Sequence, residues 1–367
     1  MKKIGIDIRL YSQTGVGTYI RNLIHYLIRE NTEGVTFYLY VLPQDAGKLP
    51  KLPYNFIVRE SPCLWHSFQE QILLLLIILK DNLDLMHFTY FGFPILYWRP
   101  FISTIHDITP LSHKTGKAST KSRFIYEIKV FIFKIVLHYQ VRNSKAIITP
   151  SFTVKKSLIK LYGKIYEKKI TPIYEGVDYQ LTHADENRLL IRDFASPFMI
   201  YIGNFYPHKN IQRLIKAFSK IKSNIKLILI GPKDYFTNQI KKEIEKLHLE
   251  EKVTFFHNVS VSDLKFYYLN AKALIHPSFS EGFGLPIIEA KFFHCPVIIS
   301  DIEIFHELTG NNAIFFNPQD ELDMVKKINL FNQKDSGDYS NTIDSRMSFE
   351  LMTQRTLLLY THCLKKQ

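Results

Sequence analysis

The chain has 367 residues, of which 46% are hydrophobic and 22% are charged, and its formal net charge is +13. This length exceeds that of a typical single domain and the composition excludes a disordered chain, so we expect two globular domains. Residues 1–180 hold 24 Lys and Arg against 13 Asp and Glu, whereas the remainder holds 23 against 21. The basic half suits anionic lipid or a phosphorylated acceptor, and since no nucleic-acid-binding motif accompanies the charge, we expect no nucleic-acid partner.

The three cysteines, Cys63, Cys295 and Cys363, lack metal or disulfide spacing, which is typical of reduced thiols in a cytoplasmic protein. The opening segment MKKIGIDIRL predicts a strand rather than an export signal, because Asp7 and Arg9 interrupt its apolar run. The longest apolar run, residues 72–79, is shorter than the roughly 20 residues that cross a bilayer, and it predicts a buried helix.

The first domain is predicted to span residues 1–180 and to open with a strand, a glycine loop and a helix, the first unit of a doubly wound sheet. Further strands are predicted at VTFYLYVL, LDLMHFTY, FISTIHD and KAIITPS, and a helix after the last of them ends at Gly163. The polar stretch 180–193 predicts a linker.

The strand and helix pattern restarts in a second domain, residues 194–346. Its predicted strands are FMIYIGN, IKLILIG, KVTFFHN, KALIHPS, CPVIIS and AIFF. Near-continuous apolar strands between helices indicate parallel sheets covered on both faces, so we predict an α/β protein with two Rossmann-like domains facing each other across a cleft. A last helix within 347–367 has no strand after it, and we expect it to pack back on the first domain.

The segment SEGFGLPIIEA, residues 280–290, contains the most specific pattern. It follows the predicted strand ALIHPS, at the edge of the sheet where α/β proteins bind ligands. Its two glycines and the following helix start suit a phosphate. Because carboxylates would repel phosphate, we expect Glu281 and Glu289 to accept hydrogen bonds from hydroxyl groups on either side of it, as in a nucleotide sugar. A solvated loop acid and a helix-dipole residue are the structural alternative for these two glutamates.

The segment EGFGLPIIE resembles the E-x7-E motif of retaining glycosyltransferases of family 4, which have the GT-B fold of two facing Rossmann domains. TGVGTYIRNLI, TIHDITPL, PIYEGVD and YIGNFYPHKNIQRLIKAF follow the family's order over nearly the whole chain. The resemblance implies that Glu281 binds the transferred sugar and Glu289 the nucleotide ribose. It also implies that the backbone at Gly282, Phe283, Gly284 and Leu285 holds the donor.

Lys209, in the segment GNFYPHKN, provides the cation that a departing diphosphate requires. Many family members carry an Arg five positions earlier, where this chain has Asn204; Arg213, one helical turn after Lys209, is the substitute we consider. Asn204 and Arg213 are both assigned to donor binding.

His106 and Asp107 match a His–Asp pair of the family, in which the His lines the acceptor side near the anomeric carbon. We assign His106 to catalysis, with a packed structural histidine as the alternative, and Asp107 to helix capping. Gly15 and Gly17 do not complete a G-x-G-x-x-G pattern, and the resemblance implies that their loop closes on the donor phosphate and acceptor. The other histidines, His276 among them, form no ligand spacing and are interpreted as structural.

No D-x-D triplet occurs in the chain, so we expect transfer without a metal and without a cofactor beyond the donor itself. The region 121–143 mixes basic and apolar residues. Two interpretations stay open for it: a solvated basic face over a buried apolar one, or docking on an anionic membrane.

We therefore expect a hexosyltransferase of cell-envelope polysaccharide synthesis, cytoplasmic or peripheral on the inner face of the membrane. The expected donor is GDP- or UDP-hexose, of mannose or glucose type, and the acceptor is a glycan or lipid-linked. A nucleotide-sugar epimerase and a GT-B protein that binds a nucleotide sugar without transferring it are the alternatives.

Overall fold

The computed structural model describes residues 1–109, 123–193, 196–333 and 343–365, and these divide into two compact units. Among the described residues, unit 1 contains 1–109, Phe124–Glu175 and the C-terminal segment from Arg346, whereas unit 2 contains Arg123 and the chain from Gly176 to Ser345. The first unit thus ends five residues before the predicted boundary at residue 180.

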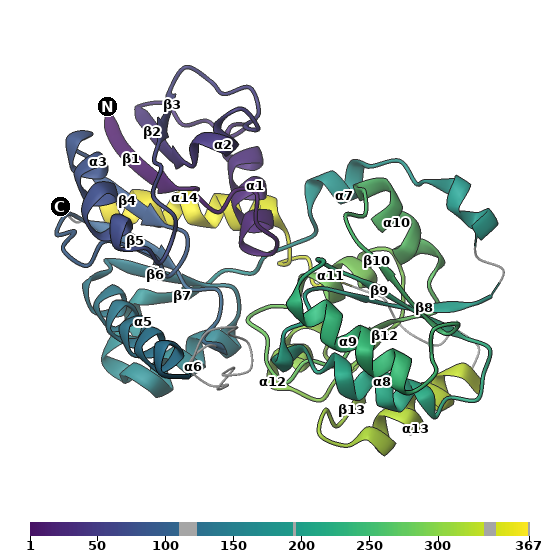
Figure 1. The fold of residues 1–367 in the computed structure, drawn as a ribbon. Coiled ribbons are helices and arrows are strands. Elements are labelled where there is room, and N and C mark those ends of the chain that lie inside the picture. The colour runs from purple at the N-terminus through teal and green to yellow at the C-terminus, as the bar shows by residue number, and fades with distance from the viewer. Residues whose placement is uncertain (110–122, 194–195, 334–342, 366–367) are drawn as a thin grey trace. The chain divides into compact units, whose positions relative to one another are not determined.

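Unit 1 is built on a seven-stranded parallel sheet with the strand order β3-β2-β1-β4-β5-β6-β7 (Figure 1). Its strands are β1 Lys2–Asp7, β2 Val35–Val41, β3 Phe56–Glu60, β4 Leu85–Phe88, β5 Phe101–Thr104, β6 Ala146–Thr149 and β7 Ile170–Pro172. Its helices are α1 Val16–Leu27, α2 Pro43–Ala46, η1 Glu70–Leu74, α3 Leu75–Lys80, α5 Arg123–Asn143, α6 Phe152–Tyr162, η3 Lys164–Lys169 and α14 Phe349–Lys365. Strands β3 and β7 were not among the predicted strands.

Unit 2 is built on a six-stranded parallel sheet with the order β10-β9-β8-β11-β12-β13. Its strands are β8 Phe198–Ile202, β9 Lys226–Ile230, β10 Val253–Phe256, β11 Leu274–His276, β12 Val297–Ser300 and β13 Ile314–Phe316. Its helices are α7 Tyr179–His183, η4 Arg188–Asp193, η5 Pro207–Lys209, α8 Ile211–Ser219, α9 Tyr235–Lys246, α10 Val261–Asn270, α11 Leu285–Phe292, α12 Glu303–Thr309 and α13 Glu321–Gln333. All six strands lie where the sequence predicted them.

Helix packing follows the apolar periodicity of the sequence. The four residues of α8 that recur at helical spacing, Ile211, Leu214, Ile215 and Phe218, are buried in the core of unit 2. Helix α6 begins at Ser151, whose hydroxyl accepts a hydrogen bond from the Val154 amide, and ends at Gly163 with φ of 102°. Both ends of α6 therefore have the local chemistry that starts or stops a helix.

The apolar run at residues 72–79 forms the end of the π-helix η1 and most of α3, but it is not the buried helix that we predicted. Leu74 and Ile78, one turn apart, are buried, whereas Ile72 is 52% and Leu76 is 60% exposed. The run is apolar on every side, and only one side of a surface helix can face the core. Within the described chain no helix is long and apolar enough to span a lipid bilayer.

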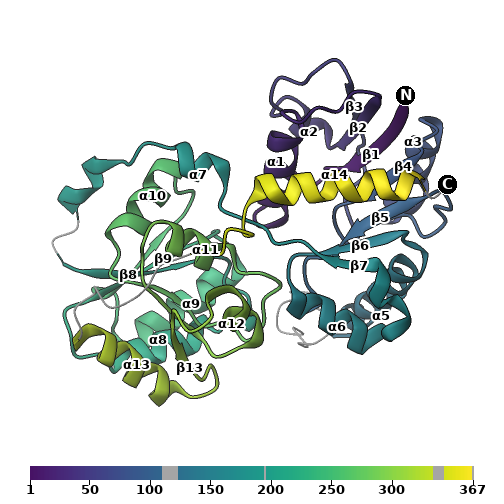
Figure 2. The same cartoon turned by 180° about the vertical axis from the view of Figure 1, so that it is seen from behind.

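Helix α14 belongs to unit 1, where it lies beside α1 on one face of the sheet (Figure 2). Its Tyr360 hydroxyl is 2.7 Å from Nδ1 of the buried His87 on β4, and Nε2 of His87 is 2.8 Å from the Thr104 hydroxyl. Burial, with a smaller contribution from His106, lowers the pKa of His87 to about 3, so this ring is neutral near pH 7.

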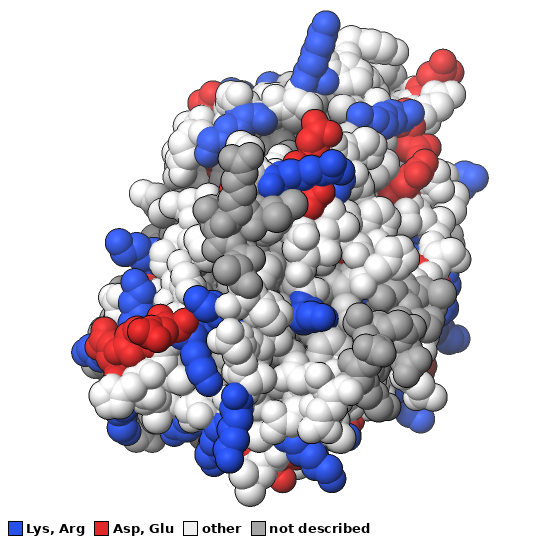
Figure 3. Space-filling model, turned by 90° about the vertical axis from the view of Figure 1, so that its right-hand side faces the viewer, with Lys and Arg blue, Asp and Glu red and all other residues white. Residues whose placement is uncertain are grey.

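The face drawn in Figure 3 carries side chains of both signs. Cations with acidic partners include Lys220 of unit 2, whose Nζ lies 2.7 Å from Glu321. Exposed pairs of this kind contribute little to stability.

Replacing Tyr360 by Phe should destabilise unit 1, because Nδ1 of the buried His87 loses its hydrogen-bond partner. Leaving a buried polar atom unpaired costs about 1–3 kcal/mol. We expect a lower urea midpoint for the transition of unit 1, measured by circular dichroism. Tyr235→Phe removes a hydroxyl from a half-exposed tyrosine of α9 and should leave the midpoint unchanged. Equal midpoints for Tyr360→Phe and the native protein would contradict the assignment.

Candidate functional site

The site in unit 2 begins where β11 ends and α11 starts. Gly284 is the N-cap of α11 with φ of 123°, and Pro286 lies in the first turn of the helix. A Cβ at Gly284 would come within 3.4 Å of the side chains of Leu308, Ile287 and Phe305. The positive φ favours glycine here, and a Cβ would fit only tightly among these side chains. Gly282 and Phe283 lie in this loop and Leu285 is the first residue of α11, as the sequence predicted.

One oxygen of Glu281 gathers three hydrogen-bond donors. Oε1 accepts from Lys209 Nζ at 2.6 Å, from Ser278 Oγ at 2.7 Å and from His276 Nε2 at 2.9 Å. The side chain of Glu281 is 12% exposed, and within the described chain its Oε2 has no hydrogen-bond partner. The carboxylate is thus oriented through one oxygen, and the other oxygen is left to accept from a ligand hydroxyl.

These contacts decide the charge of the cluster. Burial opposes ionisation of Glu281, but the Lys209 ammonium and the hydrogen bond from His276 outweigh it and hold the pKa of this carboxyl well below its usual range. Burial also lowers the pKa of His276, whose ring stacks on Tyr201 at 5.6 Å. A neutral His276 donating from Nε2 to an ionised Glu281 follows from these two shifts.

Lys209 is positioned by a turn that is hydrogen-bonded to the loop after β11. Lys209 ends η5, and the next residue, Asn210, has the left-handed φ of 61°. The Asn210 side-chain amide donates to the carbonyls of Pro277 and Pro318, and the Phe279 amide donates to the His208 carbonyl at 2.8 Å. The cation and the carboxylate are therefore carried by two segments that are joined directly.

Glu289 lies in a different environment from Glu281. It is 8% exposed in α11, and its Oε2 accepts a hydrogen bond of 2.6 Å from the Tyr268 hydroxyl of α10. Burial raises the pKa of Glu289 to about 7, against the hydrogen bond from Tyr268 and with a contribution from Asp178. Only about half of the Glu289 side chains are ionised near neutral pH, whereas nearly all Glu281 side chains are.

The two residues considered as further donor contacts have other partners. Arg213 donates through Nη1 to the Pro318 carbonyl at 2.6 Å and lies over the Phe279 ring at 5.4 Å, so it braces the loops behind Lys209. The Asn204 carbonyl accepts a hydrogen bond from the Tyr201 hydroxyl. Their assignment to donor binding stays a prediction.

In unit 1, both ring nitrogens of His106 are hydrogen-bonded. Nδ1 is 3.0 Å from Glu175 Oε1, Nε2 is 3.0 Å from the Thr89 carbonyl oxygen, and the Tyr19 ring packs against the imidazole at 4.8 Å. A carbonyl only accepts, so Nε2 carries a proton. In this state neither nitrogen is left for a substrate, and a catalytic role for His106 requires that one of these bonds open. The predicted capping role of Asp107 agrees with its bond to the Thr109 amide at 2.9 Å.

The structure explains the two loop glycines of unit 1 in different ways. Gly15 is the N-cap of α1 with φ of 65°. A Cβ at Gly17 would lie 2.9 Å from the carbonyl oxygens of Leu10 and Tyr11, so the backbone there packs too closely for a side chain. Their predicted part in donor binding is not needed to explain either residue.

The sequence analysis missed four residues that shape these sites: His276, Ser278, Tyr268 and Glu175. His276 was interpreted as structural, yet it donates to Glu281. Its position could have indicated this contact, because His276 ends the strand that leads into the loop of Glu281, five residues before that glutamate. Tyr268 and Glu175 reach their partners from other elements, and spacing could not reveal them. The part of the chain that the structure describes has no cluster of three or more His, Cys, Asp or Glu suited to a metal.

Two family descriptions match the chain: Glycosyltransferase Family 4 over residues 13–181 and Glycosyl transferases group 1 over residues 191–344. Among characterised proteins, the chain is 31% identical to the O-antigen chain mannosyltransferase RfbU of Salmonella typhimurium over 297 residues, which is 81% of this chain and 78% of that protein.

Solved structures agree in fold. Sucrose-phosphate synthase from Thermosynechococcus elongatus superimposes with a TM-score of 0.75 at 16% identity, with all of both chains covered. The Anabaena protein HepE in complex with UDP-glucose gives a TM-score of 0.75 at 15% identity, with 99% of this chain and all of that chain covered. The fold is therefore the two-domain GT-B fold, and the chain belongs to glycosyltransferase family 4.

Proposed function

We propose that this glycosyltransferase moves a mannose-type hexose from a nucleoside diphosphate sugar to a glycan or lipid-linked acceptor in cell-envelope polysaccharide synthesis. The similarity to an O-antigen chain mannosyltransferase supports the sugar and the pathway class. It favours GDP-mannose as the donor, with UDP-hexose as the second choice. The reaction would take place on the cytoplasmic side, at the inner face of the membrane.

The observation that carries the proposal is the pairing of Lys209 with Glu281 beside the start of α11. A sugar bound through its hydroxyls to Oε2 of Glu281 would present its diphosphate to the Lys209 ammonium and to the N-terminal end of α11, whose dipole favours negative charge. Charge grows on the diphosphate as the glycosidic bond breaks, so a cation placed there lowers the energy of the transition state more than that of the ground state.

We infer retention of configuration without a protein nucleophile and without a metal. The acceptor hydroxyl attacks the anomeric carbon on the face that the diphosphate leaves, and an oxygen of the departing diphosphate takes the hydroxyl proton. Lys209 would then be shared between the diphosphate and Glu281. His276 and Ser278 keep Oε1 of Glu281 hydrogen-bonded while Lys209 shifts toward the phosphate.

The donor is identified most directly by a thermal-shift panel. A ligand that binds only the folded protein stabilises it, and the stabilisation grows with the ratio of the ligand concentration to its dissociation constant. We expect GDP-mannose to raise the melting temperature more than GDP, UDP-glucose or UDP-galactose. A UDP-hexose that gives the largest shift would overturn the choice of donor but not the transferase assignment.

Replacing Glu281 by Gln should lower kcat/KM for transfer by about 100-fold, because one preorganised group at the reacting sugar is lost. Nucleotide affinity should be nearly unchanged, since Glu289 and the helix start remain. Transfer is measured with a radiolabelled donor and affinity by calorimetry with the nucleoside diphosphate. Glu321→Gln removes the same charge from a surface ion pair and should behave like the native protein. A large loss of nucleotide affinity in Glu281→Gln would contradict the assignment.

Nucleotide binding should tighten by up to roughly tenfold between pH 6 and pH 8 as Glu289, whose pKa is about 7, loses its proton and becomes a better acceptor for ribose hydroxyls. Glu289→Gln should abolish this pH dependence. Tyr268→Phe removes a hydrogen bond that favours the carboxylate, so the midpoint should move to higher pH. Calorimetric titrations at five pH values measure both effects, and a flat profile in the native protein would refute the role of Glu289.

A further inference from the structure

Unit 1 exposes large apolar side chains on one group of neighbouring segments. Phe68 is 80%, Trp98 is 72% and Phe131 is 63% exposed. The group, here called the apolar face, consists of Leu64, Phe68, Ile72, Leu73, Leu76, Leu96, Trp98, Ile128, Phe131, Ile132, Ile135 and Tyr139. Single exposed apolar residues are ordinary on soluble proteins, but gathered ones mark a binding surface.

The segments of the apolar face are joined by contacts and lie on one side of the sheet. The Gln71 side chain of η1 donates to the Phe93 carbonyl and accepts from the Ile95 amide, which fixes the loop of Leu96 and Trp98 beside η1. Val136 of α5 packs against the same core as Leu74 and Ile78. Two connections, β3–α3–β4 and β5–α5–β6, run in the same direction across the sheet, and the connection β1–α1–β2 runs in the opposite direction. Because such crossovers are right-handed, α3 and α5 lie on one face of the sheet, and α1 and α14 lie on the other (Figures 1 and 2).

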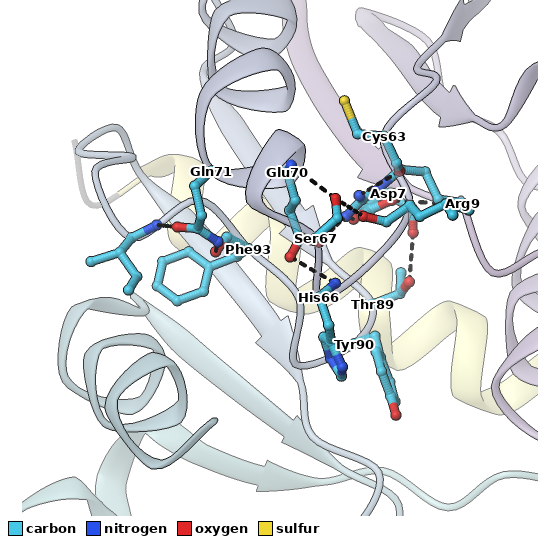
Figure 4. Close-up of polar contacts among 12 residues, drawn as sticks. Asp7, Arg9, Cys63, His66, Ser67, Glu70, Gln71, Thr89, Tyr90 and Phe93 are labelled. Atoms are coloured by element: carbon cyan, nitrogen blue, oxygen red, sulfur yellow. Dashed lines mark hydrogen bonds and ion pairs between the residues drawn. The ribbon is translucent and has the colours of Figure 1, made fainter. Parts of the chain in front are cut away.

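The support of the apolar face is rigid. Glu70, the first residue of η1, is buried, and its two oxygens accept from Arg9 Nη2 at 2.7 Å and from the His66 amide at 3.1 Å (Figure 4). Arg9 also pairs with Asp7 at the end of β1, at 2.6 Å. Breaking a buried charge network of this kind is costly, so η1 and its exposed side chains are held to β1 in the interior of the sheet.

Positive charge borders the apolar face. Exposed on the same helices, or just after them, are Lys80 of α3, Lys134 and Arg142 of α5, and Lys145. Between residues 114 and 169 the sequence holds 14 Lys and Arg, and only Glu127 and Glu167 as acids. Each cation close to an anionic bilayer adds to the attraction, and salt weakens it.

We propose that the apolar face docks this protein on an anionic lipid bilayer, with Trp98 and Phe131 at the level of the headgroups and the basic side chains over anionic lipid. Membrane docking would bring the protein to a lipid-linked acceptor, and in this respect it rests on the proposed function. Peripheral proteins bind bilayers through this combination of apolar area and positive charge.

Two other occupants fit the apolar face less well. In a symmetric dimer the same patch meets itself, so the basic residues around it would be brought against each other. Single-stranded nucleic acid binds through aromatic stacking platforms along a basic groove. The branched aliphatic side chains Ile72, Leu73 and Ile132 offer no such platform.

Co-sedimentation of the full chain with vesicles, without donor, tests the proposal. We expect binding to phosphatidylcholine vesicles that contain about one third phosphatidylglycerol, weaker binding at higher salt and little binding to pure phosphatidylcholine, as surface attraction to anionic lipid requires. The combined variant Leu76→Ser, Trp98→Ser and Phe131→Ser should lower the partition coefficient at least tenfold. Lys134→Gln with Arg142→Gln should lower it mainly at low salt.

The control variant Leu322→Ser with Leu358→Ser removes leucines that are 66% and 70% exposed on α13 and α14, and it should bind as the native protein does. Unchanged melting temperatures show that the variants fold. No binding to anionic vesicles at low salt, equal binding by the apolar-face variant, or a concentration-dependent dimer that this variant abolishes would each overturn the proposal. Transfer to a water-soluble acceptor tests the transferase separately, because it needs no vesicle.

Discussion

The ion pair between Lys209 and Glu281 is the contact around which the candidate site of unit 2 is built. A carboxylate that is only 12% exposed is costly to ionise, and it stays ionised because a cation and two neutral donors meet its Oε1. The same arrangement holds the Lys209 side chain in place beside Oε1 of Glu281. Cation and carboxylate are thus preorganised, which avoids much of the reorganisation that polar groups in water undergo during reaction.

Two glutamates eight residues apart perform different work because their surroundings differ. Glu281 has a cation beside it, and Glu289 has only the Tyr268 hydroxyl, with Asp178 disfavouring its charge. One carboxyl is therefore permanently ionised, and the other changes its charge near neutral pH. In the proposed function, the ionised Glu281 contacts the transferred sugar, and Glu289 contacts the ribose with a strength that depends on pH.

Unit 1 contains buried histidines that are hydrogen-bonded by residues distant in the chain. Glu175, the last residue of the unit before the chain enters unit 2, holds His106, and Tyr360 of the returning helix α14 holds His87. Glu175 at the boundary and Tyr360 within α14 thus each bind a buried histidine of unit 1. The apolar face, on the opposite side of the sheet from α14, is separate from these histidines and can bind a bilayer without disturbing them.

The sequence by itself determined the class of fold and the six strands of unit 2, because local periodicity is a property of neighbouring residues, and a specific motif singled out Lys209, Glu281 and Glu289 as candidate site residues. It could not show that His276 and Ser278 converge with Lys209 on one oxygen, or that Glu175 meets His106, 69 residues earlier. Those pairings exist only once strands distant in the chain lie side by side. Burial is likewise a tertiary property: the run at 72–79 is uniformly apolar, and only packing of Leu74 and Ile78 against the sheet decided which of its sides stays in water.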